Sequence, residues 1–496
     1  MTRQRKLSMI LIYGLPVLLA ALLKYWIYPT SVTPFNADEA IVALMARHIN
    51  QGNIPTFFYG QSYMGSLDAI FVASGFRLLG EHVWVIRLIQ SLLYLGTVFT
   101  TALLAKCLSG SGKAAFLAGL LTAIPPINTT LYTTVSLGGY GEMLLGGNIL
   151  VLSGISMINN INNEQLVLDG KYYLGLMIWG IAAGFTFWVF GLALVYIIPV
   201  AGLIFWYLRK RAAKVFWKSG LLLFTGALIG SAPWWTSALL AGNLEIITEL
   251  AGGAISGVNS GNLLMEPFYR LLSLFVFGGT ALLGLRPPWN ISWLMLPLLP
   301  FTLAFWMAVI IHGVKKIIKK QDSVGMGILA LMGLVLIVGF IFSPYGDDPS
   351  GRYFLPLYIF LAIVGGDMIA EQFNKKRILA VCTVILVLVF NLGGIVQSVL
   401  KNPPGITTQF DSITHIDQNK MDELILFLKN ENIKTGYSNY WVSYPLAFLS
   451  AEEILFVPRL PYHEDFRYTA RDDRYAPYNE IIKSAEDIAY ITTNHP

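Results

Sequence analysis

The sequence predicts an all-α membrane protein with about 11 transmembrane helices, followed by a small α/β unit. Of its 496 residues, 55% are hydrophobic and 13% charged, whereas about 25% of the residues in a soluble domain are charged. Apolar runs near the roughly 20 residues that cross a bilayer recur between residues 7 and 400, and they stop after residue 400. The chain is therefore predicted to comprise a transmembrane domain, 1–400, and a soluble domain, 401–496.

The apolar runs locate the predicted spans. The first follows a basic N-terminus and ends at Ile27 without a small-residue cleavage pattern, so we expect an uncleaved first helix. Tyr172–Tyr207 is long enough for two short spans that turn near Phe187–Gly191. The other runs are Val83–Ala105, Ala114–Ile127, Glu142–Ile158, Gly220–Leu240, Phe268–Leu285, Trp293–Ile311, Val324–Phe342, Tyr353–Ala370 and Ile378–Leu400.

Basic clusters indicate which loops face the cytoplasm. They are Arg3 to Lys6, Lys106 with Lys113, Arg209–Lys218, Lys315–Lys320 and Lys375–Arg377. All five clusters can be cytoplasmic only if the chain crosses the membrane an even number of times between consecutive clusters. This requires Phe268–Leu285, or a neighbour, to lie in the membrane plane or to re-enter the membrane on the outer face. The same is expected of Ser66–Leu79. The predicted topology has a cytoplasmic N-terminus and an extracytoplasmic C-terminal domain at the plasma (cell inner) membrane.

The C-terminal residues alternate between helical and strand patterns, which favours a small α/β unit. Helical spacing occurs at Asp422–Leu428 and Tyr444–Leu449. Short strands are predicted at Lys434–Ser438, Ile454–Pro458 and Ile488–Thr492.

Composition also argues against several function classes. The excess of positive charge, +5, sits in loops beside the apolar runs, and we find no nucleic-acid signature. Both cysteines, Cys107 and Cys382, lie in or beside apolar runs, so we expect buried core residues rather than a disulfide or a thiolate metal site. The six histidines are dispersed and give no zinc spacing.

The first candidate site follows the first span, within Thr33–Gly65. Asp38 and Glu39 are adjacent carboxylates at the membrane rim, where acids are costly and therefore candidates for function. A structural alternative is that Asn36 or Asp38 caps the helix that begins near Ala40. Glu39 would then simply complement the helix dipole.

Three further charged residues lie near the predicted outer ends of spans. Glu142 follows three glycines without a compensating charge nearby, and it is either a site residue or a rim glutamate that reaches water. Arg87 and Arg352 could anchor their helices at the interface. Arg352 could alternatively pair with Asp347 or Asp348, or bind a phosphate through its planar fork.

The order of these features resembles the GT-C superfamily of membrane glycosyltransferases. It runs from the Asp-Glu pair after the first span, through VWVIRLIQSLLYLGTVFTTALLAKCLSG and an acid that begins a later span, to GRYFLPLYIFLA. The most similar branch is that of the protein O-mannosyltransferases and the bacterial lipid A aminoarabinose transferase. The chain departs from that branch at Tyr59–Gly65, where a His-x-Pro-Pro motif is frequent, which affects the expected acceptor more than the reaction.

The resemblance implies transfer of a sugar from a polyprenyl-phosphate carrier to an acceptor hydroxyl on the outer face. Asp38 would be the base, and a single base would invert the anomeric centre. Glu39 and Glu142 would orient substrate or Asp38. Arg352, or Arg87, would neutralise the carrier phosphate. The other expected substrate-binding residues are Gln61, Tyr63, Tyr140 and Tyr353.

The resemblance leaves the cofactor and some alternatives open. Carboxylates could hold Mg²⁺ or Mn²⁺, as in the oligosaccharyltransferase branch, but the branch resembled here generally works without a metal, and we assign no metal ligand. The acceptor could be a lipid, a glycan or a protein. A lipid-linked sugar flippase would share the span count, although we find no internal repeat. A non-catalytic scaffold would not explain the charges at the rim.

Overall fold

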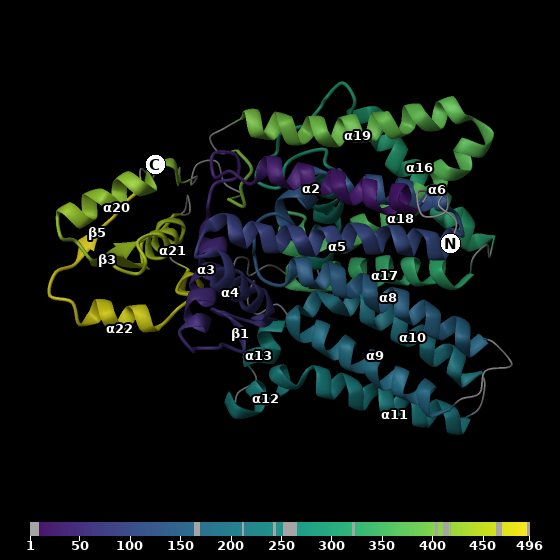
Figure 1. The fold of residues 1–496 in the computed structure, drawn as a ribbon, viewed down its shortest axis with the longest axis horizontal. Coiled ribbons are helices and arrows are strands. Elements are labelled where there is room, and N and C mark those ends of the chain that lie inside the picture. The colour runs from purple at the N-terminus through teal and green to yellow at the C-terminus, as the bar shows by residue number, and fades with distance from the viewer. Residues whose placement is uncertain are drawn as a thin grey trace.

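The computed structural model describes residues 9–162, 169–210, 213–241, 245–250, 265–319, 323–401, 405–409, 416, 418–462 and 469–493. Figure 1 shows a bundle of long helices with a smaller helix-and-strand segment against one end. We call this smaller part, residues 401–496, the C-terminal segment. Helices α3 (Ala37–Asn50) and α4 (Leu67–Leu79) lie where the two parts meet (Figure 1).

Nine helices in the described part of the chain are long and apolar enough to cross a membrane. Their 18 to 27 residues fit the thickness of a bilayer. The protein is therefore a multi-pass membrane protein. The nine are Ile10–Gly14 with α2 (Leu15–Ile27), α5 (Val83–Ser109), α8 (Tyr140–Asn162), α9 (Gly170–Val189), Gly191–Ala193 with α10 (Leu194–Arg209), α16 (Leu299–Ile318), α17 (Ser323–Phe342), Arg352–Phe354 with α18 (Leu355–Lys375) and α19 (Arg377–Leu400).

The prediction was about 11 spans, give or take two; the described residues contain these nine helices, one bent helix pair and one shorter apolar helix. Helix α6 (Gly112–Ala123) has 12 residues and ends before a Pro-Pro pair. Helices α11 (Ala213–Gly230) and α12 (Ala232–Ala241) are bent by 65°, and they make a tenth span if they are counted together. The remaining short helices are α7 (Ile127–Tyr132), α13 (Glu245–Thr248), α14 (Glu266–Ser273), the π-helical Leu274–Gly279 and α15 (Thr280–Leu282).

The predicted turn near Phe187–Gly191 is confirmed, since α9 ends at Val189 and the backbone of Phe190 is extended. Ser66–Leu79 and Phe268–Leu285 were expected in the membrane plane. Neither is among the nine spans, but their orientation to a membrane stays a prediction.

Helices α9 and α11 pack backbone to backbone through small residues. A Cβ added to Gly180 or Gly184 would collide with the backbone of α11, and one added to Gly226 or Gly230 would collide with α9. Glycines four residues apart on both helices therefore allow the two backbones to approach closely. Such packing holds helices together inside a membrane, where no hydrophobic effect drives them together.

A hairpin connects α3 to α4. Its strands β1 (Phe57–Phe58) and β2 (Gln61–Gly65) pair antiparallel, and the turn between them contains Gly60 with φ +68°. A glycine is favoured at this position because other residues rarely adopt positive φ.

The C-terminal segment contains a three-stranded parallel sheet in the order β4-β3-β5. Thr435 of β3 lies opposite Leu455 of β4, and Gly436 lies opposite Ala489 of β5. The predicted α/β pattern is thereby confirmed. Its elements are α20 (Met421–Asn430), β3 (Thr435–Ser438), α21 (Tyr440–Leu449), β4 (Leu455–Pro458), α22 (Pro477–Lys483) and β5 (Ala489–Tyr490).

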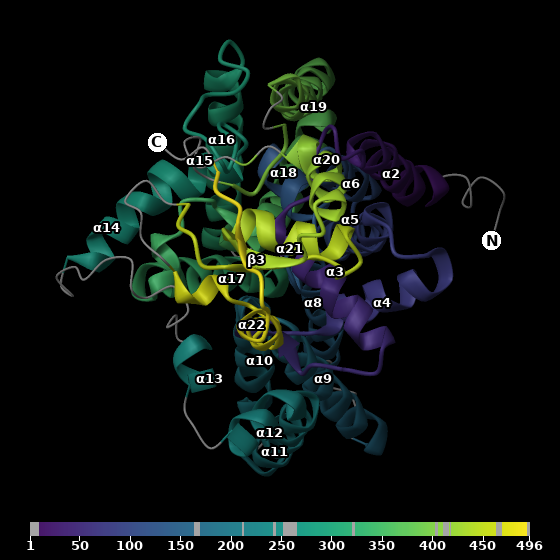
Figure 2. The same ribbon diagram turned by 90° about the vertical axis from the view of Figure 1, so that its left-hand side faces the viewer.

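Helix α21 packs against α3, as Figure 2 shows from the end that carries the C-terminal segment. Phe448 of α21 stacks on Phe76 with ring centroids 6.0 Å apart, and its ring lies 5.6 Å from that of Phe35. One apolar cluster thus includes residues from both parts of the chain. The division into two domains at residue 400 stays a prediction.

The expectation that both cysteines are core residues was wrong. Cys107 on α5 and Cys382 on α19 are free and exposed. In a membrane protein the outer faces of the spans are apolar as well, because they meet lipid, so an apolar neighbourhood in the sequence does not imply burial inside the protein.

Candidate active site

Asp38 lies in the first turn of α3, where it is half-buried and reaches the C-terminal segment. Its neighbour Asn36 caps the helix by accepting a hydrogen bond from Glu39 N at 3.0 Å. Asp38 Oδ1 instead accepts a hydrogen bond from the Tyr440 hydroxyl at 2.6 Å. Because Asn36 supplies the cap, the Asp38 carboxylate is left for another role.

Three more side chains of the C-terminal segment gather around Asp38. Tyr462, Asp472 and Arg474 all interact electrostatically with its carboxylate. Burial raises the pKa of Asp472 to about 6, although Arg474 and a hydrogen bond from Tyr462 oppose the shift. Two carboxylates and a guanidinium therefore share this region.

The hairpin before α4 contacts the same arginine. Arg474 Nη1 donates to Gly60 O at 3.2 Å. With its amide turned to satisfy its neighbours, the Gln61 oxygen accepts hydrogen bonds from Arg474 at 2.8 and 3.0 Å and from Arg471 at 3.3 Å. The structure thus places Gln61 against the C-terminal segment, near Asp38 but already bonded.

Glu39 and Arg87 form a buried pair. Arg87 Nε and Nη2 donate to the two carboxylate oxygens of Glu39, each at 2.9 Å, and both side chains are 0% exposed. Arg87 Nη1 also donates to Tyr28 O at 2.5 Å. Two predicted site residues therefore satisfy each other and tie α3 to α5 and to the end of the first span.

Arg352 pairs with Asp348, with 2.7 Å between Nη2 and Oδ2. The other acid considered from the sequence, Asp347, pairs with Arg270 at 3.0 Å. The Arg352 side chain keeps 31% exposure, and its Nε has no hydrogen-bond partner among the described residues. The guanidinium is therefore paired with Asp348 but partly exposed.

Two buried tyrosines connect the surroundings of Asp38 with those of Arg352 through their electrostatic interactions. Tyr132 interacts electrostatically with both residues. Tyr140, at the start of α8, interacts with Arg352 and has its ring centroid 6.1 Å from that of Tyr132. The carboxylate and the guanidinium thus belong to one connected region.

An apolar cavity of about 280 Å³ is lined by Tyr353, the residue that follows Arg352. Tyr63, Tyr345 and Tyr353 line one end of it, with ring centroids 6.0 Å apart for Tyr63 and Tyr345 and 5.0 Å apart for Tyr345 and Tyr353. The Arg352 Nη2 atom donates to the Tyr353 hydroxyl at 3.4 Å. Its other lining residues include Val195 of α10 and Leu336 and Phe340 of α17.

Glu142 lies in a different group from Asp38. It is buried, neither carboxylate oxygen has a hydrogen-bond partner among the described residues, and it interacts electrostatically with Asp68. Asp68 accepts hydrogen bonds from Gln90 at 2.7 Å and from Ser136. Burial raises the pKa of Asp68 to about 6 against these hydrogen bonds.

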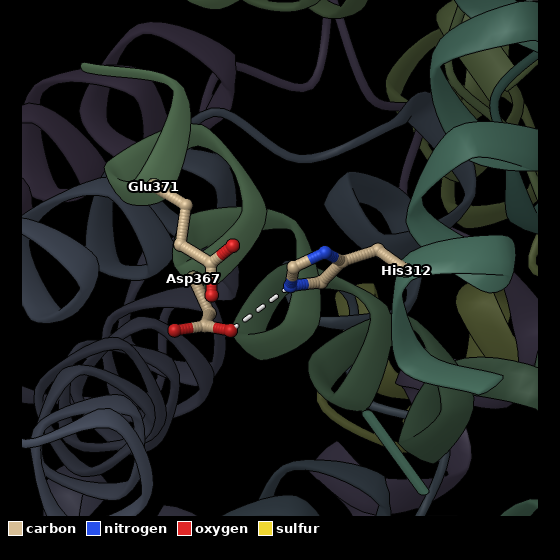
Figure 3. A group of neighbouring side chains, drawn as sticks. All are labelled: His312, Asp367 and Glu371. Carbon is tan, nitrogen blue, oxygen red and sulfur yellow. Dashed lines mark hydrogen bonds and ion pairs between the residues drawn. The ribbon is translucent and has the colours of Figure 1, made fainter. Parts of the chain in front are cut away.

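The part of the chain that the structure describes brings three His, Asp or Glu side chains within mutual reach of one cation at a single place. These are His312, Asp367 and Glu371, shown in Figure 3. Lys316 already pairs with Asp367 and lies 3.1 Å from Glu371. Asp367 also lies 15 residues along its helix from Arg352, roughly 22 Å away at 1.5 Å per residue. This group is an ion-pair cluster remote from Asp38, and no metal ligand is assigned.

Several site residues were not predicted from the sequence. Tyr440 follows a short strand, and Asp472 and Arg474 belong to a charged run that looks like solvated surface. Asp68 did carry a signal, since it is the single acid between residues 40 and 80. The C-terminal residues carried none, because only the packing of α21 on α3 brings them to Asp38.

Comparisons with known proteins give a match in structure alone. No family model matches the chain, and no curated protein matches its sequence. ArnT from Cupriavidus metallidurans in the apo state aligns with a TM-score of 0.57 at 13% identity, covering 90% of this chain and 85% of that one. The same protein bound to undecaprenyl phosphate gives 0.52 at 14% identity, with 89% and 86% covered.

The archaeal oligosaccharyltransferase AglB from Archaeoglobus fulgidus, in complex with an inhibitory peptide and a dolichol-phosphate, is also similar. Its TM-score is 0.53 at 12% identity over 91% of this chain, which spans 64% of the length of AglB. At these identities the likeness concerns the fold. The expected GT-C-like architecture is thereby confirmed: the chain has the fold that ArnT and AglB share.

Proposed function

We propose that the protein transfers a sugar from a polyprenyl-phosphate carrier to an acceptor hydroxyl, with Asp38 as the base. One observation carries the proposal: a half-buried carboxylate not needed as a cap lies in one connected region with the partly exposed guanidinium of Arg352, whose neighbour Tyr353 lines an apolar cavity. The similar solved proteins were captured with undecaprenyl phosphate and with a dolichol-phosphate.

Asp38 and Arg352 have different roles in the proposed reaction. The acceptor oxygen attacks the anomeric carbon, its proton passes to Asp38, and the bond between that carbon and the phosphate oxygen breaks. Negative charge then develops on the departing polyprenyl phosphate, which Arg352 stabilises. The apolar cavity lined by Tyr353 takes the first units of the polyprenyl chain. Attack opposite the leaving group inverts the anomeric configuration.

This function places the site at the outer face of the plasma (cell inner) membrane, with the N-terminus in the cytoplasm. The five basic clusters support that orientation if α6 and the bent pair of α11 and α12 each cross the membrane in addition to the nine spans. The acceptor is a lipid, a glycan or a protein that reaches Asp38 from the side of the C-terminal segment. No step in this scheme requires a metal.

The test is release of undecaprenyl phosphate from a panel of undecaprenyl-phosphate hexoses and pentoses by purified protein supplied with a membrane extract as acceptor. Asp38→Asn should lower the rate about 10²-fold or more and leave undecaprenyl phosphate binding unchanged. Asp422→Asn is the matched control, because Asp422 occupies the first turn of α20 and is exposed. An Asp38→Asn variant with more than about a tenth of the wild-type rate would overturn the assignment of the base.

A further inference from the structure

Tyr440 is held at the point where two helices begin. It follows strand β3 at the carboxyl end of the parallel sheet and is the first residue of α21. Asn439 caps α21 by accepting a hydrogen bond from Val442 N at 3.2 Å, and its amide donates to Thr493 at 3.1 Å. The Tyr440 hydroxyl therefore projects from a fixed helix start toward Asp38 in the first turn of α3.

The other ends of the two helices are joined as well. Arg47 Nη2 donates to Phe448 O at 3.1 Å, and its guanidinium lies 4.7 Å from the centre of the Phe448 ring. Glu452 lies 3.0 Å from His48 Nε2 and accepts a hydrogen bond from Tyr478 at 2.7 Å. From Asp38 to Arg47 is roughly 14 Å of helix. The position of Tyr440 over Asp38 is thus fixed at both ends of the contact.

The Tyr440 hydroxyl also determines which oxygen of Asp38 is available. It occupies Oδ1, and no hydrogen bond to Oδ2 is found from the described residues. The hydrogen bond fixes the carboxylate rotamer, so that the other oxygen keeps a constant direction toward an incoming hydroxyl. Misplacement of a reacting group by about 1 Å can cost about 10²-fold in rate.

We propose that Tyr440 is a positioning residue for Asp38, so that the C-terminal segment completes the reaction centre. The inference rests on the proposed function, because it assigns Tyr440 a role in the same transfer. A merely structural tyrosine would contribute through its ring, which packs at 5.1 Å from Trp441 and 5.5 Å from Tyr444. A positioning role requires the Tyr440 hydroxyl, whereas a structural role requires only its ring.

The test uses Tyr440→Phe in the full-length protein, with release of undecaprenyl phosphate from whichever undecaprenyl-phosphate sugar the wild type turns over. We expect kcat to fall about 10-fold or more, with KM for that donor and the melting temperature unchanged. Tyr478→Phe is the matched control, since it removes a hydroxyl that donates to a carboxylate at 2.7 Å on the far side of the same interface. It should keep the wild-type kcat.

The pH profile gives a readout that loss of packing would not produce. A hydrogen bond to a carboxylate favours its charged form, so the acidic limb of kcat/KM should move to higher pH in Tyr440→Phe. Replacing Tyr440 by 3-fluorotyrosine, whose hydroxyl is a stronger donor, should move it to lower pH. The other titratable or charged groups that face Asp38 are Tyr132, Tyr462, Asp472 and Arg474. Both profiles are therefore measured in an Asp472→Asn background as well.

The outcomes are distinct. A wild-type protein that releases no undecaprenyl phosphate from any donor overturns the proposed function and this inference with it. An active wild type, inactivated by Asp38→Asn, in which Tyr440→Phe and Tyr478→Phe behave alike overturns the inference alone. The same holds if the phenylalanine and fluorotyrosine variants shift the acidic limb in the same direction. If Tyr440→Phe lowers the melting temperature, the 3-fluorotyrosine variant decides, because it keeps both the ring and the hydroxyl. A shift of its acidic limb to lower pH supports the inference, and an unchanged limb overturns it.

Discussion

Removal of one side chain from the Glu39–Arg87 pair should destabilise the protein far more than loss of an exposed ion pair. Both side chains are 0% exposed and share two contacts of 2.9 Å. Each variant, Glu39→Gln or Arg87→Gln, leaves a buried group without its partner, which costs about 3–5 kcal/mol of unfolding free energy. The unfolding free energies lost in the two single variants sum to about 6–10 kcal/mol. The double variant should lose about 1–3 kcal/mol less than that sum, because it leaves no buried charge without a partner.

The assay is equilibrium unfolding in detergent, followed by far-ultraviolet circular dichroism for the wild type, both single variants and the double variant. The exposed pair Lys420–Glu423 is the control, with a contact of 2.8 Å but side chains 74% and 70% exposed. Its removal should cost about 0–1 kcal/mol. Single losses that add within about 0.5 kcal/mol would refute the reasoning, because they would mean that the two groups do not depend on each other.

Two further predictions concern the carrier phosphate and the orientation in the membrane. Arg352→Ala should lower turnover at saturating donor by roughly 10²-fold, and Arg352→Lys should restore only part of it because a lysine lacks the planar fork; an alanine variant that melts early yet turns over normally would assign Arg352 to its pairing with Asp348. With both native cysteines removed, a cysteine at the exposed Glu480 should react with an impermeant thiol reagent in intact cells, whereas one at Lys319 should not, and the reverse pattern would contradict the predicted sidedness.

The sequence was sufficient for the parts of the molecule that local pattern determines. The α/β pattern after residue 400 was predictable because strands of period two and helices of period 3.6 alternate over short stretches. Asp38 was identifiable as a site candidate because an acid at a membrane rim is costly. The bounds of one helix were less accessible, since α6 ends before the Pro-Pro pair at 125–126, inside the apolar run Ala114–Ile127.

The partners of the candidate residues could not be predicted, because they come from remote parts of the chain. Tyr440 and Asp38 are 402 residues apart, and Arg87 and Glu39 are 48 apart. The Arg352–Asp348 pair was anticipated as one of two local alternatives because the residues are four positions apart. What the sequence lacked was the docking of α21 along α3, which depends on surface shape and not on any motif.

Asp38 and Glu39 are adjacent in sequence, yet their surroundings differ completely. Successive residues of a helix point about 100° apart, so one carboxylate of the pair turns into the protein and the other turns toward the C-terminal segment. Glu39 points inward, where Arg87 neutralises it and fixes the start of α3. Asp38 points outward, where it is half-buried and held at one oxygen. The buried pair therefore anchors the very turn that presents Asp38. A substitution at Glu39 should reduce transfer by displacing Asp38, even if Glu39 never touches a substrate.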